Sequence, residues 1–153
     1  MVWRSGPLSL AYLTVDGASP VEHVEAASAA GFAAAGLRIQ SPSHLPGAQN
    51  AVGNAALVRD IRRALAATGV RAMDAEVATL SAGIEPQAYR PLVETAAELG
   101  FQLIQVVCED PDLDRATDRL AAFLRTWPQP SSCGLRSSSC AFARLAHWMR
   151  RSR

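Results

Sequence analysis

One phrase occurs three times in the sequence and constrains the fold more than any other feature. Each copy is the end of an Ala-rich segment, then a glycine, an aromatic residue or valine, and a short apolar run: "AASAAGFAAAGLRI", "RALAATGVRAMDAEV" and "TAAELGFQLIQVVC". The glycines are Gly31, Gly69 and Gly100, and their spacing is typical of successive βα units. Glycine directly after a helix accepts the left-handed backbone that ends the helix. The phrase therefore predicts alternating helices and strands.

The starts and faces of the expected helices can also be located. "SPVE" places Ser19 as N-cap, Pro20 at the first helical position and Glu22 as the partner in a capping box. Asn54 is expected to cap the second helix and Asp112 a fourth. The apolar faces expected for these two helices are Leu57, Val58, Ile61 and Leu65, and Leu113, Thr117, Leu120 and Leu124.

Four short apolar runs are the expected strands, at residues 8–14, 34–39, 70–77 and 102–108. The order βαβαβαβα predicts a parallel sheet with right-handed crossovers. Four such units suit either a doubly wound sheet or half of a (β/α)8 barrel. A complete barrel takes about 250 residues, and the chain has 153.

Composition agrees with a folded chain, but the charge is unevenly distributed. The sequence is 49% hydrophobic and 19% charged, which is typical of globular proteins. All 14 acidic residues lie within residues 1–118, whereas residues 119–153 hold seven arginines and no acid. Three cysteines without C-x-x-C spacing argue against a zinc site or a disulfide framework. We find no signal-peptide pattern and no long apolar run, and expect a cytoplasmic protein without a membrane partner.

The basic residues gather in a Ser-, Arg- and Cys-rich tail, residues 127–153, where a fifth strand is expected and no apolar strand is found. The chain has 15 arginines and no lysine, which indicates GC-rich coding DNA. An out-of-frame reading of such DNA yields this composition, so we interpret the tail as a frameshift product. Two alternatives stay open: an arm that contacts nucleic-acid phosphates, and an amphipathic helix that binds a partner.

Candidate functional side chains follow the expected strands, because parallel α/β folds gather their chemistry at the carboxyl ends of strands. Glu76 shares a strand face with Asp74, and burying two carboxylates is costly unless they are paired or bind a ligand. A purely structural interpretation pairs Asp74 with Arg71 or Arg38 and Glu76 with loop amides. The further candidates are Tyr12, Arg38, His44 and Glu109, whereas His23 is expected on the protein surface.

The segment "EDPD", residues 109–112, permits two interpretations. Its carboxylates could form a metal-binding loop. A turn that leads into Asp112 as N-cap explains the same residues without a metal, and this is the interpretation that we adopt.

Residues 6–125 resemble the sugar phosphate isomerase/epimerase group of xylose isomerase-like barrels, through "LSLAYLTV", "AAGFAAAGLRI", "GVRAMDAEVATL" and "AAELGFQLIQVVCEDPD". The resemblance implies that residues 1–126 are four consecutive βα units forming the N-terminal half of a (β/α)8 TIM barrel, with residues 127–153 as a tail foreign to the family. It also implies carbohydrate metabolism and a small sugar-like substrate, in preference to a nucleic acid.

The implied chemistry is proton transfer between neighbouring carbons by a glutamate, assisted by a divalent metal (Mn, Mg or Zn). Glu76 matches that glutamate, and Tyr12, Arg38, His44 and Glu109 are the expected substrate contacts. The family's metal ligands come largely from the second half of the barrel, so we expect no metal site in this chain, no activity of the truncated chain alone, and self-association through its exposed sheet edges. The alternative is a non-enzymatic half-barrel, or a remnant that binds nucleic acid through its basic end.

Overall fold

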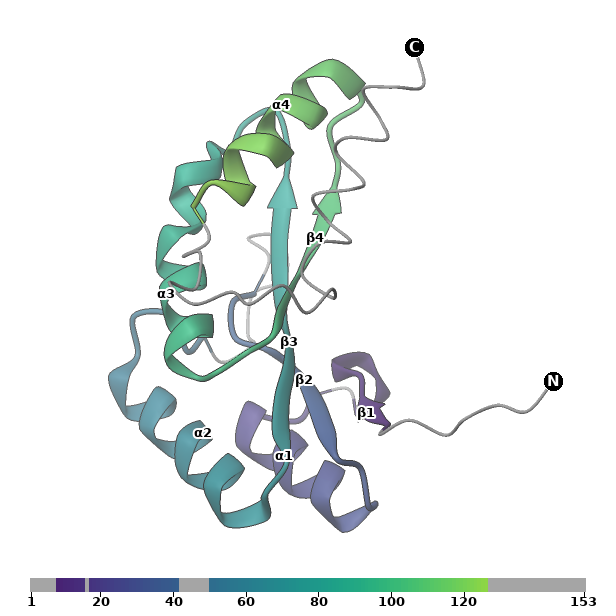
Figure 1. Cartoon of the computed structure of the whole chain (residues 1–153), viewed down its shortest axis with the longest axis vertical. Coiled ribbons are helices and arrows are strands. Elements are labelled where there is room, and N and C mark those ends of the chain that lie inside the picture. Colours follow the sequence, from purple (N-terminus) through teal and green to yellow (C-terminus); the bar gives the residue numbers. More distant parts are fainter. Residues whose placement is uncertain (1–7, 16, 42–49, 127–153) are drawn as a thin grey trace, which may run out of the picture. The chain divides into compact units, whose positions relative to one another are not determined.

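The computed structural model of the chain is an α/β structure (Figure 1) and describes residues 8–15, 17–41 and 50–126. Its four strands form one sheet in the order β1-β2-β3-β4, and β2 is parallel to both β1 and β3. The alternation of strands and helices that the repeated phrase predicts is therefore confirmed. In chain order the elements are β1 (Ser9–Leu10), the 3-10 helix η1 (Tyr12–Thr14), α1 (Pro20–Ala29), β2 (Ala34–Arg38), α2 (Ala55–Thr68), β3 (Arg71–Leu80), the 3-10 helix η2 (Pro86–Tyr89), α3 (Arg90–Glu98), β4 (Leu103–Cys108) and α4 (Leu113–Leu124).

The chain divides into two compact units. The first comprises Met1–Thr79 and Pro91–Val107, and the second comprises Leu80–Arg90 and Cys108–Arg153. Almost all of the sheet and the first three helices belong to the first unit, whereas η2 and α4 belong to the second. Within the described ranges, none of the helices has the length and apolar character needed to cross a bilayer.

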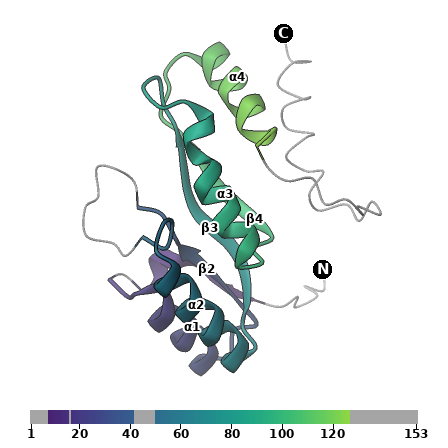
Figure 2. The ribbon, with the colours of Figure 1, turned by 90° about the vertical axis from the view of Figure 1, so that its left-hand side faces the viewer.

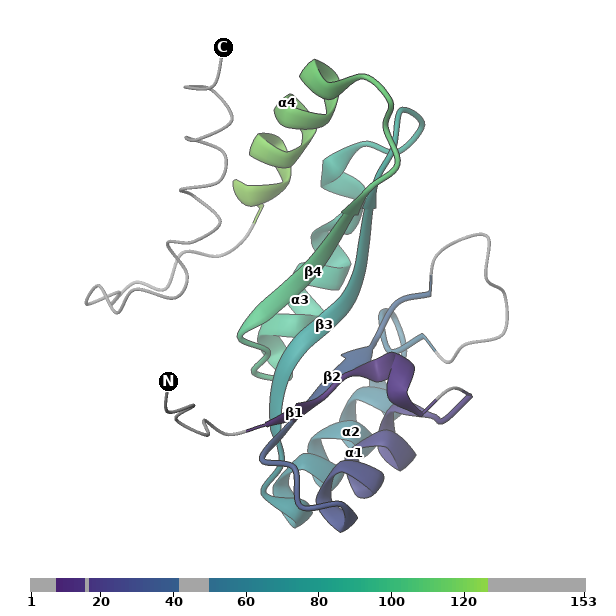
Figure 3. The same ribbon diagram turned by 90° about the vertical axis from the view of Figure 1, so that its right-hand side faces the viewer.

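In the first unit, helices α1, α2 and α3 cover one face of the sheet (Figures 2 and 3). The sheet contributes Leu37 to the core, and the helices contribute Val24, Ile61 and Leu92, all of them fully buried. Aliphatic side chains from the sheet and from the helices therefore form the core between these two layers, as a βα arrangement requires. This packing holds the strand ends that carry the candidate site.

The helix ends confirm the predicted capping. Ser19 accepts a hydrogen bond from the backbone N–H of Glu22, whose carboxylate accepts one from the Ser19 backbone N–H, at 3.2 and 2.8 Å. Asn54 caps α2 by accepting from the Leu57 N–H. The three repeated glycines all have left-handed backbones, with φ of 78°, 71° and 78° for Gly31, Gly69 and Gly100. A side chain would strain this conformation, which explains the repeated phrase.

Two strands differ from the prediction. β1 is only two residues long, because the chain turns into η1 through hydrogen bonds from the Thr14 N–H to the Ala11 carbonyl and from the Val15 N–H to the Tyr12 carbonyl. An apolar run such as 8–14 does not distinguish a strand from a tight helical turn. β3 instead continues three residues past the predicted end, to Leu80. Glu76 therefore lies within β3, opposite Arg38 at the end of β2.

The pairing of β2 with β3 contains an irregularity. Ala35 pairs with Ala72 and Leu37 pairs with Ala75, so β3 has one more residue than β2 over this interval. Such a bulge re-aims the side chains next to it. Here it places Asp74 beside Gly36 of β2.

In the second unit, α4 packs on η2. The rings of Tyr89 and Phe123 meet edge to face, with their centroids 6.1 Å apart. The predicted apolar face of α4 is wrong in part: Leu113 is 74% exposed, Leu120 and Leu124 are half-buried, and the buried residues are Ala116 and Phe123. The contact of Phe123 with Tyr89 of η2 rotates the buried face away from Leu113.

Candidate functional site

Three of the sequence candidates are brought together in the first unit. Tyr12 lies in η1, Arg38 ends β2, and Glu76 is its register partner in β3. The Arg38 guanidinium carbon lies 4.4 Å from the centre of the Tyr12 ring, in cation–π geometry. Arg38 also donates from Nη2 to Oε2 of Glu76, at 3.2 Å. We call Tyr12, His23, Arg38, Asp74 and Glu76 the strand-end cluster, and its other two members are described below.

The ion pair between Arg38 and Glu76 is mostly removed from solvent. Their side chains are 15% and 8% exposed. The purely structural interpretation in which loop amides satisfy Glu76 does not hold, because Arg38 is the partner that the described residues give it. The strand register explains this result, since it places Arg38 directly across from Glu76. An arginine at this depth can hold a carboxylate or the oxygen atoms of a ligand.

Burial raises the pKa of the Glu76 carboxyl above its ordinary value. The hydrogen bond and positive charge of Arg38 oppose this rise, and the nearby charge of Asp74 adds to it. Burial likewise raises the pKa of Asp74. A carboxyl with a raised pKa exchanges protons closer to neutral pH, which is the property that general acid–base chemistry requires.

His23 is the clearest error of the sequence prediction. It is fully buried rather than on the surface, its Nε2 lies 3.4 Å from the Leu10 carbonyl oxygen, and its ring centre is 5.8 Å from that of Tyr12. Its Nδ1 has no hydrogen-bond partner. The sequence contained the signal, because Pro20, His23, Val24 and Ala27 recur at the i, i+3, i+4, i+7 spacing of a buried helix face.

Gly36 is a second residue that the sequence did not single out. A Cβ placed on Gly36 would lie 2.6 Å from Oδ2 of Asp74, far inside van der Waals contact. Glycine therefore leaves room for the Asp74 carboxylate against the β2 backbone. The bulge in β3 brings Asp74 close to Gly36. The sequence composition does not predict this bulge.

Two sequence candidates remain, Glu109 and His44. Glu109 is exposed and belongs to the second unit, where its backbone N–H donates to the Leu80 carbonyl at 2.9 Å. His44 and the whole tail, residues 127–153, lie outside the described residues. The frameshift interpretation and its two alternatives therefore remain predictions.

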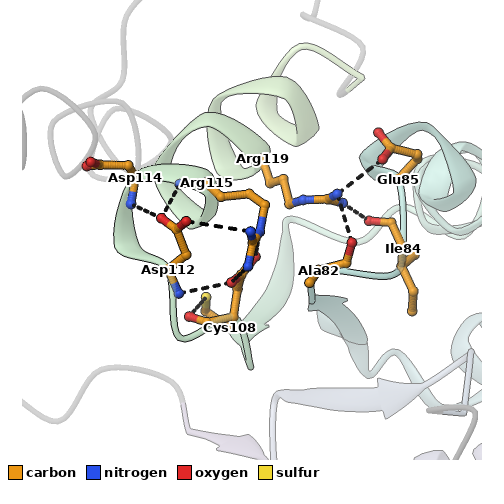
Figure 4. Close-up of polar contacts among 9 residues, drawn as sticks. Ala82, Ile84, Glu85, Cys108, Asp112, Asp114, Arg115 and Arg119 are labelled. Atoms are coloured by element: carbon orange, nitrogen blue, oxygen red, sulfur yellow. Dashed lines mark hydrogen bonds and ion pairs between the residues drawn. The ribbon is translucent and has the colours of Figure 1, made fainter.

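In the second unit, the "EDPD" segment forms the predicted turn and helix cap (Figure 4). Asp112 accepts hydrogen bonds from the backbone N–H groups of Asp114 and Arg115 and so caps α4. Arg115 donates from Nε and Nη2 to the two oxygens of buried Asp110, at 2.7 and 2.6 Å. This guanidinium holds the pKa of Asp110 below its ordinary value.

Arg119 of α4 binds the segment that follows β3 (Figure 4). It donates to the carbonyl oxygens of Ala82 and Ile84, and it pairs with Glu85 at 3.1 Å. Arg115 and Arg119 thus hold Asp110, Asp112 and Glu85 in ion pairs within the described part of the second unit.

The described residues do not provide a site for the divalent metal that the family resemblance implies. No group of three or more His, Cys, Asp or Glu side chains within residues 8–15, 17–41 and 50–126 is arranged to hold an ion. Asp110 is engaged by Arg115, and Asp112 caps a helix. We therefore derive no step through a metal.

Comparison of the sequence with models of known protein families and with curated proteins gives no match. The chemistry of the chain therefore has to be argued from the strand-end cluster itself.

Proposed function

We propose that the chain is the first half of a (β/α)8 barrel of the sugar phosphate isomerase/epimerase type, and that Glu76 is its proton-transferring group. The resemblance of residues 6–125 supports the family, and the four-stranded βα arrangement is compatible with half of such a barrel. The observation that carries the chemistry is the buried Arg38–Glu76 pair at the end of β2, where ligands bind in folds of this kind.

In the proposed reaction, the Glu76 carboxylate takes the proton from a carbon next to the substrate carbonyl. The electron pair of the broken C–H bond moves onto the carbonyl oxygen and forms an enediolate, and Glu76 then returns a proton to carbon. Tyr12 and Arg38 line the same cluster and are the proposed substrate contacts. The raised pKa of Glu76 favours this exchange near neutral pH.

The partial reaction is the most sensitive test. The chain is incubated in D2O with an aldose, a ketose or their phosphates, and loss of the C–H signal beside the carbonyl is followed by proton NMR. We expect Glu76→Gln to slow this exchange by about a hundredfold, the lower end of what a positioned base supplies. Net isomerisation demands more, because the proton must also reach the neighbouring carbon, and we do not expect it from the chain alone.

The matched control is Glu98→Gln. Glu98 pairs with Arg62 as Glu76 pairs with Arg38, but both partners are about half exposed. The control should exchange deuterium at the wild-type rate. Equal exchange by the wild type and by Glu76→Gln would contradict the proposal.

A further inference from the structure

Two arginine–carboxylate pairs with a buried carboxylate, Arg115–Asp110 and Arg38–Glu76, differ in the number of hydrogen bonds they make. Arg115 uses the whole edge of its guanidinium, because Nε and Nη2 each donate to one oxygen of Asp110. Arg38 makes a single hydrogen bond to Glu76, from Nη2, and it is long, at 3.2 Å. The Nε of Arg38 is buried and has no hydrogen-bond partner.

A buried guanidinium N–H without an acceptor is unusual, because burying a donor unpaired costs free energy. The planar edge formed by Nε and Nη2 matches two oxygens of one phosphate, sulfate or carboxylate group. Glu76 accepts from Nη2, one of the two nitrogens of this edge, while the Tyr12 ring lies against the face of the guanidinium. The geometry therefore leaves Arg38 able to form a better pair than the one it has.

We propose that Arg38 exchanges partners: a tetrahedral oxyanion on the ligand takes both Nε and Nη2, and Glu76 is released from Arg38 as it binds. This inference deepens the proposed function, since it names the group that Arg38 recognises, and rests on that function only for what Glu76 does after its release. The ligand class is a small phosphorylated or sulfated molecule. Oxyanion binding thereby couples ligand recognition to freeing the carboxylate.

The exchange predicts a specific dependence on pH. Protonating Glu76 weakens its hold on Arg38, so the oxyanion should bind more tightly at lower pH. Among residues 8–15, 17–41 and 50–126, the other titratable groups around the pair are Tyr12 from η1, His23 from α1 and Asp74 from β3. Variants at His23 and Asp74 are needed, because protonation of either group would also favour an anion.

Sulfate is a suitable probe, because its charge is constant between pH 5 and 8. Its binding to the full chain is followed by backbone amide NMR shifts and by calorimetry. We expect wild-type affinity to be higher at pH 5 than at pH 8, because a protonated Glu76 competes less well for Arg38. His23→Gln and Asp74→Asn should keep this dependence, and Glu76→Gln should lose it.

The variants separate the exchange from a structural role. Glu76→Gln should bind sulfate more tightly than the wild type at pH 8, because no carboxylate competes for Arg38. Arg38→Lys keeps the charge but lacks the planar edge, so it should bind at least about tenfold more weakly. Arg62→Gln removes an exposed arginine that pairs with Glu98 and should bind as the wild type does.

Unchanged or weaker sulfate binding in Glu76→Gln at pH 8 would overturn the proposal, and this variant decides the matter even if Arg38→Lys does not fold. Wild-type affinity in folded Arg38→Lys would overturn it as well. Because sulfate binding involves no proton transfer to carbon, a chain that binds sulfate as described but exchanges no deuterium would refute the proposed function alone.

Discussion

Gly36 of β2 lies directly against the carboxylate of Asp74 in β3, with both oxygens and the carboxyl carbon within 2.8 Å of where a Cβ would be. The contact arises at the bulge between the two strands. It makes residue 36 the point at which the backbone and the strand-end cluster constrain each other most closely. A glycine here is needed for space, because its φ is not in the left-handed region.

Gly36→Ala is accordingly expected to destabilise the protein by about 1–3 kcal/mol, the usual range for overpacking. Chemical denaturation with urea measures this change. Gly83→Ala is the control, since a Cβ at Gly83 meets no atom within 4 Å. In the double variant Gly36→Ala/Asp74→Ala the penalty of Gly36→Ala should largely disappear, because contacting residues do not behave additively. An equal penalty with and without Asp74 would show that the contact is not its cause.

The repeated phrase predicts the order of the elements and the left-handed glycines, and the segments at Ser19 and Asn54 predict the helix caps, because these features depend on local sequence. The length of β1 could not be predicted because an apolar run does not distinguish a strand from a tight helical turn. The end of β3 and the bulge could not be predicted, since they depend on how strands pair. The pairing of Arg38 with Glu76 follows from this register for the same reason.

Burial of polar side chains was the harder part of the site. His23 is buried although the sequence prediction places it on the surface, and its helical spacing puts it with Val24 and Ala27 on the buried face. The buried face of α4 depends on the tertiary contact of Phe123 with Tyr89, which local sequence does not show. For His23, helical periodicity is therefore a better guide to burial than the polarity of the residue.

The pH dependence of stability should reveal the two buried carboxyls. Burial raises the pKa of Glu76 and of Asp74, so the folded state binds their protons more tightly than the unfolded state. Their contribution is therefore greatest at low pH and declines as pH rises from their ordinary values, 4.5 and 3.8, through the raised ones. Glu76→Gln should flatten this decline in urea unfolding between pH 4 and 8. Glu98→Gln, an exposed control, should leave the slope as it is; an unaltered slope in Glu76→Gln would argue against a raised pKa.

Asp110 should have the opposite effect on the pH dependence of stability, at acidic pH. Its pKa is lowered by Arg115, so its stabilising contribution is present above its ordinary value of 3.8 and is lost as pH falls through the lowered one. Arg115→Gln should therefore speed amide hydrogen exchange in the first turn of α4 at neutral pH. Arg63→Gln removes an exposed arginine from an i, i+3 pair with Asp60 and should have little effect. Wild-type exchange in Arg115→Gln would contradict the role given to this pair.

Self-association is expected at β4, an edge strand of the described sheet. Leu103 and Val107 are exposed at alternate positions of this strand, at 38% and 37%, and an open edge with apolar side chains recruits other chains. Val107→Lys should shift sedimentation equilibrium toward the monomer. Leu113→Lys tests whether any exposed apolar residue suffices, because Leu113 is more exposed but lies on a helix. Equal effects of the two variants would point away from the strand edge.

The central claim is that Glu76 is a buried proton carrier held by Arg38, and the titration of its carboxyl carbon tests this most directly. Protein labelled with 13C at glutamate carboxyls is titrated by NMR, and Glu76→Gln assigns the resonance. The account predicts a pKa above the ordinary 4.5 for Glu76, and a further rise when sulfate occupies Arg38 and removes the charge that opposes it. A pKa at or below 4.5 that sulfate does not change would contradict the account.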